Sequence, residues 1–205
     1  MFSPQSKRRI SMSYRIEKKM SVTSFQLSKL IIFLENEGMK KLFPKRTIKS
    51  VYFDNNSFES FYQSEEGVLP RKKIRVRHYP DNPNSDLSLE IKISSMEGRF
   101  KQTKKISQSK FDLYKKFGIL DNLYGLVMPV SIVEYSREYY SFDGFRITID
   151  QNILYTKFGN KSNFYDPMNV IELKGSYNSP PDIFQKIIKS KQKRFSKYSN
   201  SIIFS

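Results

Sequence analysis

Charged side chains recur at every second position in five segments of this chain. In the segment RKKIRVRHY, Lys73, Arg75 and Arg77 alternate with Ile74 and Val76. Alternate residues of a strand point to the same face of a sheet, so this segment has one charged face and one apolar face. The other segments contribute Arg15, Glu17 and Lys19; Ser88, Glu90 and Lys92; Arg146, Thr148 and Asp150; and Glu172 and Lys174. The sequence therefore predicts a sheet with one face organised for anionic ligands.

Arg75 and Arg77 are the sharpest basic pair. Two residues apart on a strand, their side chains project about 7 Å from each other, which suits guanidinium forks on neighbouring phosphates. A lone R-x-R is equally typical of a solvated strand face, and a lone E-x-K of a cross-strand ion pair worth roughly a few tenths of a kcal/mol. Three E-x-K pairs, with R-x-R between them, favour a shared site: Glu17 with Lys19, Glu90 with Lys92, and Glu172 with Lys174.

Basic side chains gathered on one face repel each other unless an anion lies between them. Phosphate oxygens relieve the repulsion, and each charge-assisted hydrogen bond contributes about 1.5–3 kcal/mol. Interspersed carboxylates add oxygen ligands for Mg²⁺ or Mn²⁺, and cations with a metal are typical of phosphoryl transfer. The basic set is Arg15, Lys19, Lys73, Arg75, Arg77, Lys92, Arg137, Arg146 and Lys174; the acidic set is Glu17, Glu90, Asp150 and Glu172.

The composition points to a polyanionic partner. The 36 Lys and Arg residues outnumber the 20 Asp and Glu residues and give a formal net charge of +16. Such an excess indicates nucleic acid, nucleotide, polyphosphate or an anionic membrane surface. Carboxylates placed among the basic groups disfavour a nucleic-acid surface. The chain has no cysteine, which is compatible with a reducing cytoplasm, and no apolar run long enough to span a membrane.

Most of the charged segments read as strands of one domain. We expect a loose basic tail over residues 1–11 and a single domain over residues 12–205. Expected strands cover 12–20, 48–54, 71–79, 87–95, 99–107, 131–140, 145–150 and 169–175. Expected helices begin at Ser24 and end near Gly38, span 109–117, and begin again at 180–182.

This number of strands with few helices creates an edge problem, which closure into a barrel or tunnel solves. In that arrangement the charged faces point into a hydrated lumen and the helices cover the apolar outside. The predicted fold class is therefore α+β, an antiparallel β-barrel with helices packed on its outside. His78, the only histidine, faces away from Arg75 and Arg77 and is expected to be structural, and no Walker-type glycine loop is present.

Eight motifs in a fixed order carry a resemblance to a known family. They are R-x-E-x-K (Arg15, Glu17, Lys19), YFD (Tyr52 to Asp54), R-K-x-R-x-R-x-Y (Arg71 to Tyr79), L-E-I-K (Leu89 to Lys92), Y-x-R (Tyr135 to Arg137), R-I-T-I-D (Arg146 to Asp150), E-L-K (Glu172 to Lys174) and F-S-K-Y (Phe195 to Tyr198). In this order the chain resembles the VTC polyphosphate polymerase domain over roughly residues 12 to 200. That domain belongs to the triphosphate tunnel metalloenzyme superfamily, with the CYTH adenylate cyclase and thiamine triphosphatase group.

The resemblance implies a tunnel that binds ATP with a divalent cation, Mn²⁺ or Mg²⁺, and transfers the γ-phosphate to a polyphosphate chain. It implies catalytic roles for Arg75, Arg77, Lys92, Arg137 and Lys197, and substrate binding by Arg15, Lys19, Lys73, Tyr135, Arg146, Lys174 and Ser196. Glu172 would be the leading metal ligand, while Glu17, Glu90 and Asp150 would assist by ligation or by orienting the basic groups.

Two departures from the family leave alternatives open. Eukaryotic VTC proteins also carry a regulatory domain and membrane spans, which this sequence lacks, so coupling to translocation would need a separate membrane partner. Relatives with the same tunnel hydrolyse triphosphate. The alternatives are therefore an inorganic or nucleoside triphosphatase, or a non-catalytic module that binds polyphosphate or another polyanion.

Overall fold

The computed structural model describes residues 15–82, 86–176 and 195–205; the side chains of Arg15, Ile16 and Ser176 are not among the described ones. Its elements, in chain order, are β1 (Arg15–Val22), α1 (Ser24–Asn36), β2 (Lys40–Asp54), α2 (Glu59–Glu66), β3 (Arg71–His78), β4 (Leu87–Ser95), β5 (Gly98–Ile106), α3 (Gln108–Phe117), β6 (Ile119–Asp121), β7 (Gly125–Phe142), β8 (Phe145–Lys157), β9 (Asn163–Tyr165), β10 (Asn169–Ser176) and α5 (Lys197–Phe204).

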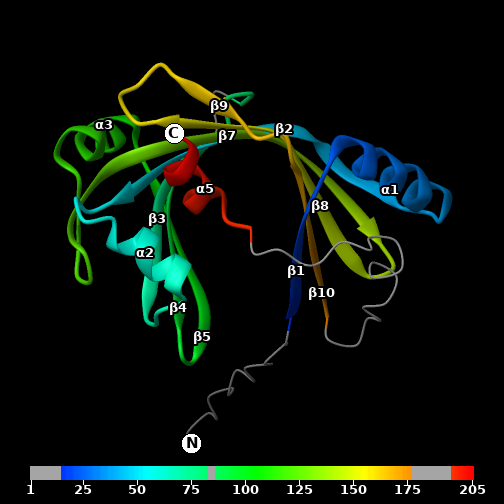
Figure 1. Cartoon of the computed structure of the whole chain (residues 1–205), viewed down its shortest axis with the longest axis horizontal. Coiled ribbons are helices and arrows are strands. Elements are labelled where there is room, and N and C mark those ends of the chain that lie inside the picture. The colour runs from blue at the N-terminus through cyan, green and yellow to red at the C-terminus, as the bar shows by residue number, and fades with distance from the viewer. Residues whose placement is uncertain (1–14, 83–85, 177–194) are drawn as a thin grey trace, which may run out of the picture.

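One antiparallel sheet runs through the whole described structure. Its strands follow the order β1-β10-β8-β7-β2-β3-β4-β5, with β6 added to β7 and β9 added to β8. The sheet curls into an arch in which β2 and β7 form the roof, while β3 to β5 and β1, β10 and β8 descend on its two sides (Figure 1). The predicted antiparallel tunnel architecture with outer helices is confirmed. It takes the form of a half-barrel, since β1 and β5 are not paired with each other in the described residues.

Helix α1 covers the convex side of the sheet at β1, β10 and β8. It begins with a capping box, because the Thr23 side chain accepts a hydrogen bond from the Gln26 backbone and the Gln26 side chain accepts one from the Thr23 backbone. Its apolar side contributes Leu27, Leu30 and Leu34 to a buried cluster with residues of those strands. The apolar strand faces therefore point outward, as the alternating sequence predicts.

Helix α3 covers the convex side over β2, β3 and β4. Phe111 is buried in a cluster with Val51, Phe53, Ile74 and Val76. The helix ends at Gly118, whose φ of 77° is a left-handed conformation that favours glycine, and a side chain there would meet the Val127 carbonyl oxygen. This glycine lets β6 pair closely with β7.

The two short helices α2 and α5 pack against each other, and α5 also packs on β7 and β8. Tyr198 of α5 lies in a buried cluster with Tyr52, Tyr135 and Tyr155 from the strands. This cluster closes one end of the concave side with apolar surface. Helix α5 thereby lies on the concave side of the sheet (Figure 1).

Several element boundaries differ from those that the sequence predicts. Strands β2, β7 and β8 extend well beyond the expected 48–54, 131–140 and 145–150. The added part of β2 is exposed, whereas that of β8 buries Ile153 and Tyr155. Helices α2 and α5 are too short, at eight residues each, to produce a clear helical period. The expected tail over 1–11 and the helix expected from 180–182 lie outside the described residues. No described helix is long and apolar enough to cross a membrane.

Candidate active site

The concave faces of β3, β4 and β5 form a basic wall of the cavity, which we define as Lys73, Arg75, Arg77, Glu90, Lys92 and Lys101. The strand register brings these residues to one face, since Arg75 lies opposite Glu90, Lys73 opposite Lys92, and Lys92 opposite Lys101. Each belongs to the alternating charged pattern of its strand.

Glu90 is the anchor of the basic wall. It is only 4% exposed. Arg75 holds it with Nε at 2.8 Å and with a second, shorter contact from Nη2, and Lys101 Nζ lies 2.6 Å from its other oxygen. Arg77 Nη1 lies 3.6 Å from the same carboxylate. Burial raises the pKa of Glu90, but the guanidinium groups of Arg75 and Arg77 outweigh burial and bring the pKa to about 2. Glu90 therefore stays ionised and orients three cations.

Tyr52 supports the basic wall from the roof strand β2. Its hydroxyl accepts a 2.9 Å hydrogen bond from Arg75 Nη1. Burial raises the pKa of Tyr52, yet the positive charges of Arg75 and Arg77 outweigh it and leave the pKa below its ordinary value. The hydroxyl of Tyr52, on the roof strand, therefore lies in the positive electrostatic potential of the basic wall.

The opposite side of the cavity is a mixed wall, which we define as Glu17, Lys19, Arg137, Asp150, Glu172 and Lys174. At its upper end Arg137 forms a fork on Asp150, with distances of 2.5 and 2.7 Å, and Lys197 of α5 lies 2.5 Å from the same carboxylate. Asp150 is 1% exposed. Burial raises its pKa, but Lys197 and Arg137 outweigh burial and lower the pKa below its ordinary value.

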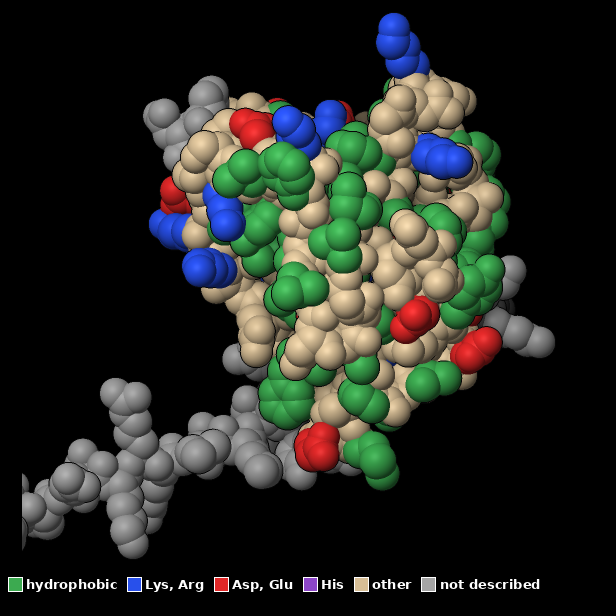
Figure 2. Space-filling view, turned by 90° about the vertical axis from the view of Figure 1, so that its left-hand side faces the viewer, with side chains coloured by type: hydrophobic (Ala, Val, Ile, Leu, Met, Phe, Trp, Pro, Cys, Tyr) green, Lys and Arg blue, Asp and Glu red, His purple; other side chains and the backbone are tan. Residues whose placement is uncertain are grey.

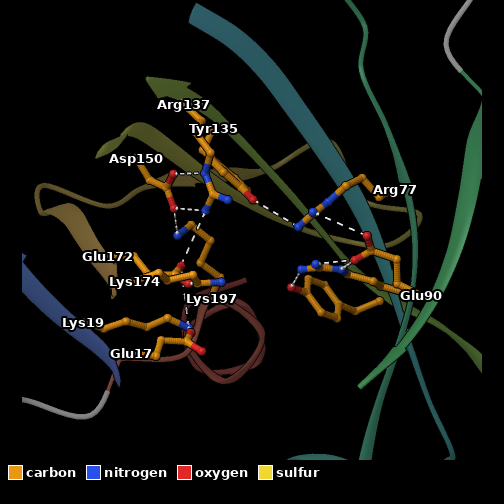
Figure 3. A network of polar contacts seen from close by, with 12 residues as sticks. Glu17, Lys19, Arg77, Glu90, Tyr135, Arg137, Asp150, Glu172, Lys174 and Lys197 are labelled. Carbon is orange, nitrogen blue, oxygen red and sulfur yellow. Dashed lines mark hydrogen bonds and ion pairs between the residues drawn. The ribbon is translucent and has the colours of Figure 1, made fainter. Parts of the chain in front are cut away.

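Glu172 lies at the centre of the mixed wall. Lys174 Nζ is 2.7 Å from one of its oxygens, and Lys19 Nζ is 3.9 Å from the other. Lys19 also lies 3.3 Å from Glu17 on the same strand. Burial raises the pKa of Glu172, but Lys19 and the other neighbours outweigh burial and lower the pKa well below its usual range. Figure 3 shows these groups facing the basic wall across the cavity.

The two walls meet beneath the roof. Arg77 Nη2 donates to the Tyr135 hydroxyl at 3.3 Å, which joins β3 to β7 (Figure 3). Lys92 of the basic wall interacts electrostatically with Lys19 and Glu172 on the other side. Although Lys92 reaches solvent, burial, with the positive charges of Arg75 and Lys19, lowers its pKa to about 7. Charged groups of the two walls therefore lie close enough to interact across the cavity.

Unused polar groups face this cavity. Within the described residues, Arg77 Nε and Thr148 Oγ1 are buried without a hydrogen-bond partner. Thr148 lies opposite Glu172 in the register of β8 and β10, on the face of the mixed wall. Buried polar groups normally have partners, so these two atoms leave hydrogen-bonding capacity unused beside the cavity.

The F-S-K-Y segment is fixed to the cavity by an anchor that the sequence reasoning missed. Asp54, which is fully buried, accepts hydrogen bonds from the backbone of Ser60 and Phe61 and from the Tyr198 hydroxyl. Tyr198 also stacks on Tyr52, with ring centroids 5.1 Å apart. The YFD and F-S-K-Y motifs therefore contact each other, and their co-occurrence was the only sequence signal for this.

This anchor places Ser196 and Lys197 in the site. Ser196 Oγ accepts a 2.8 Å hydrogen bond from Lys73 on the basic wall, while Lys197 contacts Asp150 on the other side. Lys101 is a second residue that the sequence reasoning missed. It belongs to the alternating run Lys101, Thr103 and Lys105. Because β5 is exposed along most of its length, its sequence has few apolar residues, and the alternation is hard to recognise.

The remaining predicted residues lie at the margin. Arg146 is exposed on β8, in register with Lys174, and no ion pair joins it to any described residue. The backbone of Arg15 pairs with that of Ser176 at the open end of the cavity. His78 is half-buried and lies on the opposite side of β3 from Arg77, as expected.

The carboxylates differ in how well they suit a divalent cation. No cluster of three or more metal-ligating side chains occurs among the described residues. Glu17 and Glu172 lie close enough to interact and provide two carboxylates, a set that fits Mg²⁺ or Mn²⁺ when phosphate oxygens and water complete the coordination. Glu90 and Asp150 are each held by an arginine fork and a lysine. Their contacts therefore favour the orienting role over ligation.

Comparison with protein families matches the VTC domain over residues 11–124 and 113–204. The chain belongs to the VTC domain family. Among curated proteins, no sequence matches this VTC domain.

Solved structures share the fold of this VTC domain at low sequence identity. A putative adenylate cyclase from Bacillus halodurans superposes with a TM-score of 0.64 at 15% identity, covering 94% of this chain and 98% of the other. A putative adenylyl cyclase from Hippeastrum, described as having a dominant triphosphatase activity, superposes with a TM-score of 0.52 at 13% identity, covering 93% and 96%. These matches establish the triphosphate tunnel fold.

Proposed function

We propose that this VTC domain is a metal-dependent, ATP-driven polyphosphate polymerase. The observation that carries the proposal is the pair of facing walls, whose cations are already oriented by Glu90 and Asp150 and whose buried Arg77 Nε and Thr148 Oγ1 lack partners. A triphosphate is an extended anion that can contact both walls at once. We further propose that the protein works in the cytoplasm, as expected from the sequence.

In this mechanism the basic wall and Arg137 bind the phosphates of ATP and the end of the polyphosphate chain. The bond from the γ-phosphorus to the β,γ-bridging oxygen breaks, a terminal chain oxygen forms a new bond to that phosphorus, and ADP leaves. Lys197 and Lys73 stabilise the charge on the transferred group and orient it. A divalent cation held by Glu17 and Glu172 would neutralise charge on the phosphate oxygens.

A triphosphatase is the second candidate. It is favoured by the Hippeastrum relative, whose described activity belongs to the same fold. The two reactions share substrate binding and differ in whether water or a phosphate chain reaches the γ-phosphorus. The walls described above serve both.

The test is to incubate the protein with ATP and Mn²⁺ or Mg²⁺, with and without a chelator, and to separate the products on a polyphosphate gel. A chelator-sensitive ladder of long chains together with ADP supports the polymerase. Free phosphate without a ladder replaces it with the triphosphatase. Absence of turnover, with polyphosphate binding that does not require metal, would leave only the binding module.

A further inference from the structure

Five exposed hydrophobic side chains form a patch on the outer side of the molecule, at the end of α3 and on the hairpin of β6 and β7. We call them the α3–β6 patch: Leu113 (50% exposed), Phe117 (59%), Leu120 (85%), Leu123 (40%) and Leu126 (55%). Figure 2 shows hydrophobic side chains gathered on the side of the molecule where α3 lies, with both basic and acidic side chains around them.

The patch is continuous across the two elements. Leu120 and Leu126 lie directly opposite each other on β6 and β7, so their side chains share one face of the hairpin. The Leu126 side chain approaches the backbone of Gly118, the residue after Phe117. Leu113 and Phe117 are one turn apart on α3. Leu123 lies in the turn of the hairpin.

Lysines border the patch. The exposed Lys110 and Lys116 lie on either side of the stripe that Leu113 and Phe117 form on α3. Lys116 Nζ is 5.1 Å from the centroid of the Phe117 ring. Nearby carboxylates are already paired, because Lys115 lies 2.6 Å from Asp112, and Lys72 lies 2.8 Å from Asp121. The border therefore carries excess positive charge.

This chemistry selects an anionic lipid surface as the occupant. A second copy of the chain would bring another net charge of +16, and like charges oppose association. Interfaces between proteins are depleted in lysine and enriched in tryptophan, tyrosine, phenylalanine and arginine, and of the five patch residues only Phe117 is of these types. Protruding apolar side chains bordered by lysines are typical of surfaces that enter the headgroup region of anionic bilayers.

We propose that the α3–β6 patch docks this protein on an anionic lipid bilayer. Leu120, Leu126 and Phe117 enter the boundary between headgroups and acyl chains, while Lys110 and Lys116 contact the headgroups. The patch lies on the convex side of the sheet, where α3 packs, so docking leaves the concave cavity accessible. The proposal does not depend on the reaction that the cavity performs.

Sedimentation with phosphatidylcholine vesicles, with and without phosphatidylserine, tests the docking. Saturating tripolyphosphate is added to remove binding through the cavity. We expect binding to the anionic vesicles and a loss of at least about tenfold in the partition coefficient for the double variant Phe117→Ser/Leu120→Ser. The matched control is Phe25→Ser/Ile32→Ser on α1, whose side chains are 69% and 61% exposed; this pair should retain binding.

A second pair of variants tests the lysine border. Lys110→Gln/Lys116→Gln should weaken binding to anionic vesicles more than Lys157→Gln/Lys161→Gln, which removes the same charge from exposed positions elsewhere. Circular dichroism checks that each variant is folded. No binding to either vesicle, equal losses for both apolar pairs, or equal losses for both lysine pairs would overturn the proposal. Unchanged vesicle binding of the folded patch variants would do the same, and would leave an acidic protein as the partner to seek.

Discussion

Most cations of the two walls are held by carboxylates before any anion binds, and Arg75 illustrates this at the scale of one residue. Two of its nitrogens contact Glu90, and the third donates to the Tyr52 hydroxyl. A guanidinium group held in this way loses little conformational entropy when a phosphate arrives. The carboxylates of the cavity therefore orient the basic side chains that bind the anion.

Arg75→Ala should abolish turnover and weaken tripolyphosphate binding by about 100-fold or more, since two charge-assisted hydrogen bonds become unavailable. The loss in stability should be modest, because Glu90 keeps Arg77 and Lys101 as partners. Calorimetric titration and thermal melting measure the two effects. Lys104→Ala is the matched control, since it removes a positive charge from the outer face of β5. Normal turnover of Arg75→Ala would contradict the site.

Lys92 should make anion binding sensitive to pH near neutrality. Its pKa of about 7 lies below the ordinary 10.5, and only the protonated form attracts phosphate. In metal-free buffer, wild-type affinity for tripolyphosphate should lose the Lys92 contribution between about pH 6 and pH 8, relative to Lys92→Arg, which stays charged. Titration of both proteins across this range measures the difference, and parallel pH profiles would exclude it.

The stability of the free protein should change with pH in the opposite direction. The unfolded chain holds the Lys92 proton up to about pH 10.5, whereas the folded protein releases it near pH 7. The Lys92 contribution therefore destabilises the fold below pH 7, and this penalty decreases as pH rises above 7. The Lys92→Arg variant keeps its proton, so its free energy of unfolding should not rise with pH in this way. Denaturant unfolding of both proteins at several pH values measures the difference.

At the scale of elements, helix α5 joins the two walls. Its N-cap residue Ser196 accepts a hydrogen bond from Lys73 of the basic wall, and its first residue Lys197 contacts Asp150 of the mixed wall. The helix is only eight residues long, too short to be stable alone. Its position depends on Tyr198, which stacks on Tyr52 and bonds to Asp54.

Tyr198→Phe should therefore loosen α5 and reduce phosphate affinity without removing any phosphate-binding group. We expect a loss of about 1–3 kcal/mol in the free energy of unfolding, because the buried Asp54 loses a hydrogen-bond donor. Tyr124→Phe also removes a buried tyrosine hydroxyl, which contacts Gln63 and Lys72, and provides the control. Equal tripolyphosphate affinities in the two variants would mean that α5 needs no such anchor.

At the scale of the whole molecule, the distribution of charge decides which polyanions are accepted. The net charge of +16 would attract any polyanion over long range. The binding groups, however, lie on the inner side of a curled sheet with carboxylates among them. We therefore expect a flexible phosphate chain to contact these inner groups better than a stiff duplex, whose wide body is held away from the concave face.

Polyphosphate should therefore compete with labelled tripolyphosphate far better than duplex DNA does at equal phosphate concentration, by about tenfold or more at physiological salt. Fluorescence anisotropy with each competitor measures the ratio. A shortened chain with two phosphates serves as the control for length. Equal competition by DNA would place the binding groups on an outer surface and contradict the assignment of the cavity.

The sequence by itself determined the binding face. Period-two alternation requires that Arg75 and Arg77 share one side of a strand, as do Glu172 and Lys174, and this follows from the geometry of a single strand. The same alternation required the apolar faces to be covered from outside, as α1 and α3 do. The order of the motifs then indicated the family, because eight weak patterns in sequence are specific together.

Only the tertiary structure decided how those faces meet. Which carboxylate holds which cation depends on the register between paired strands, as for Arg137 with Asp150 on β7 and β8 and Arg75 with Glu90 on β3 and β4. Because of those pairings, Glu17 and Glu172 are better suited to bind a metal than Glu90 and Asp150. The anchor between Asp54 and Tyr198 joins residues 144 positions apart, and no local period encodes it. Local patterns fix the direction of a side chain, whereas long-range packing fixes its partner.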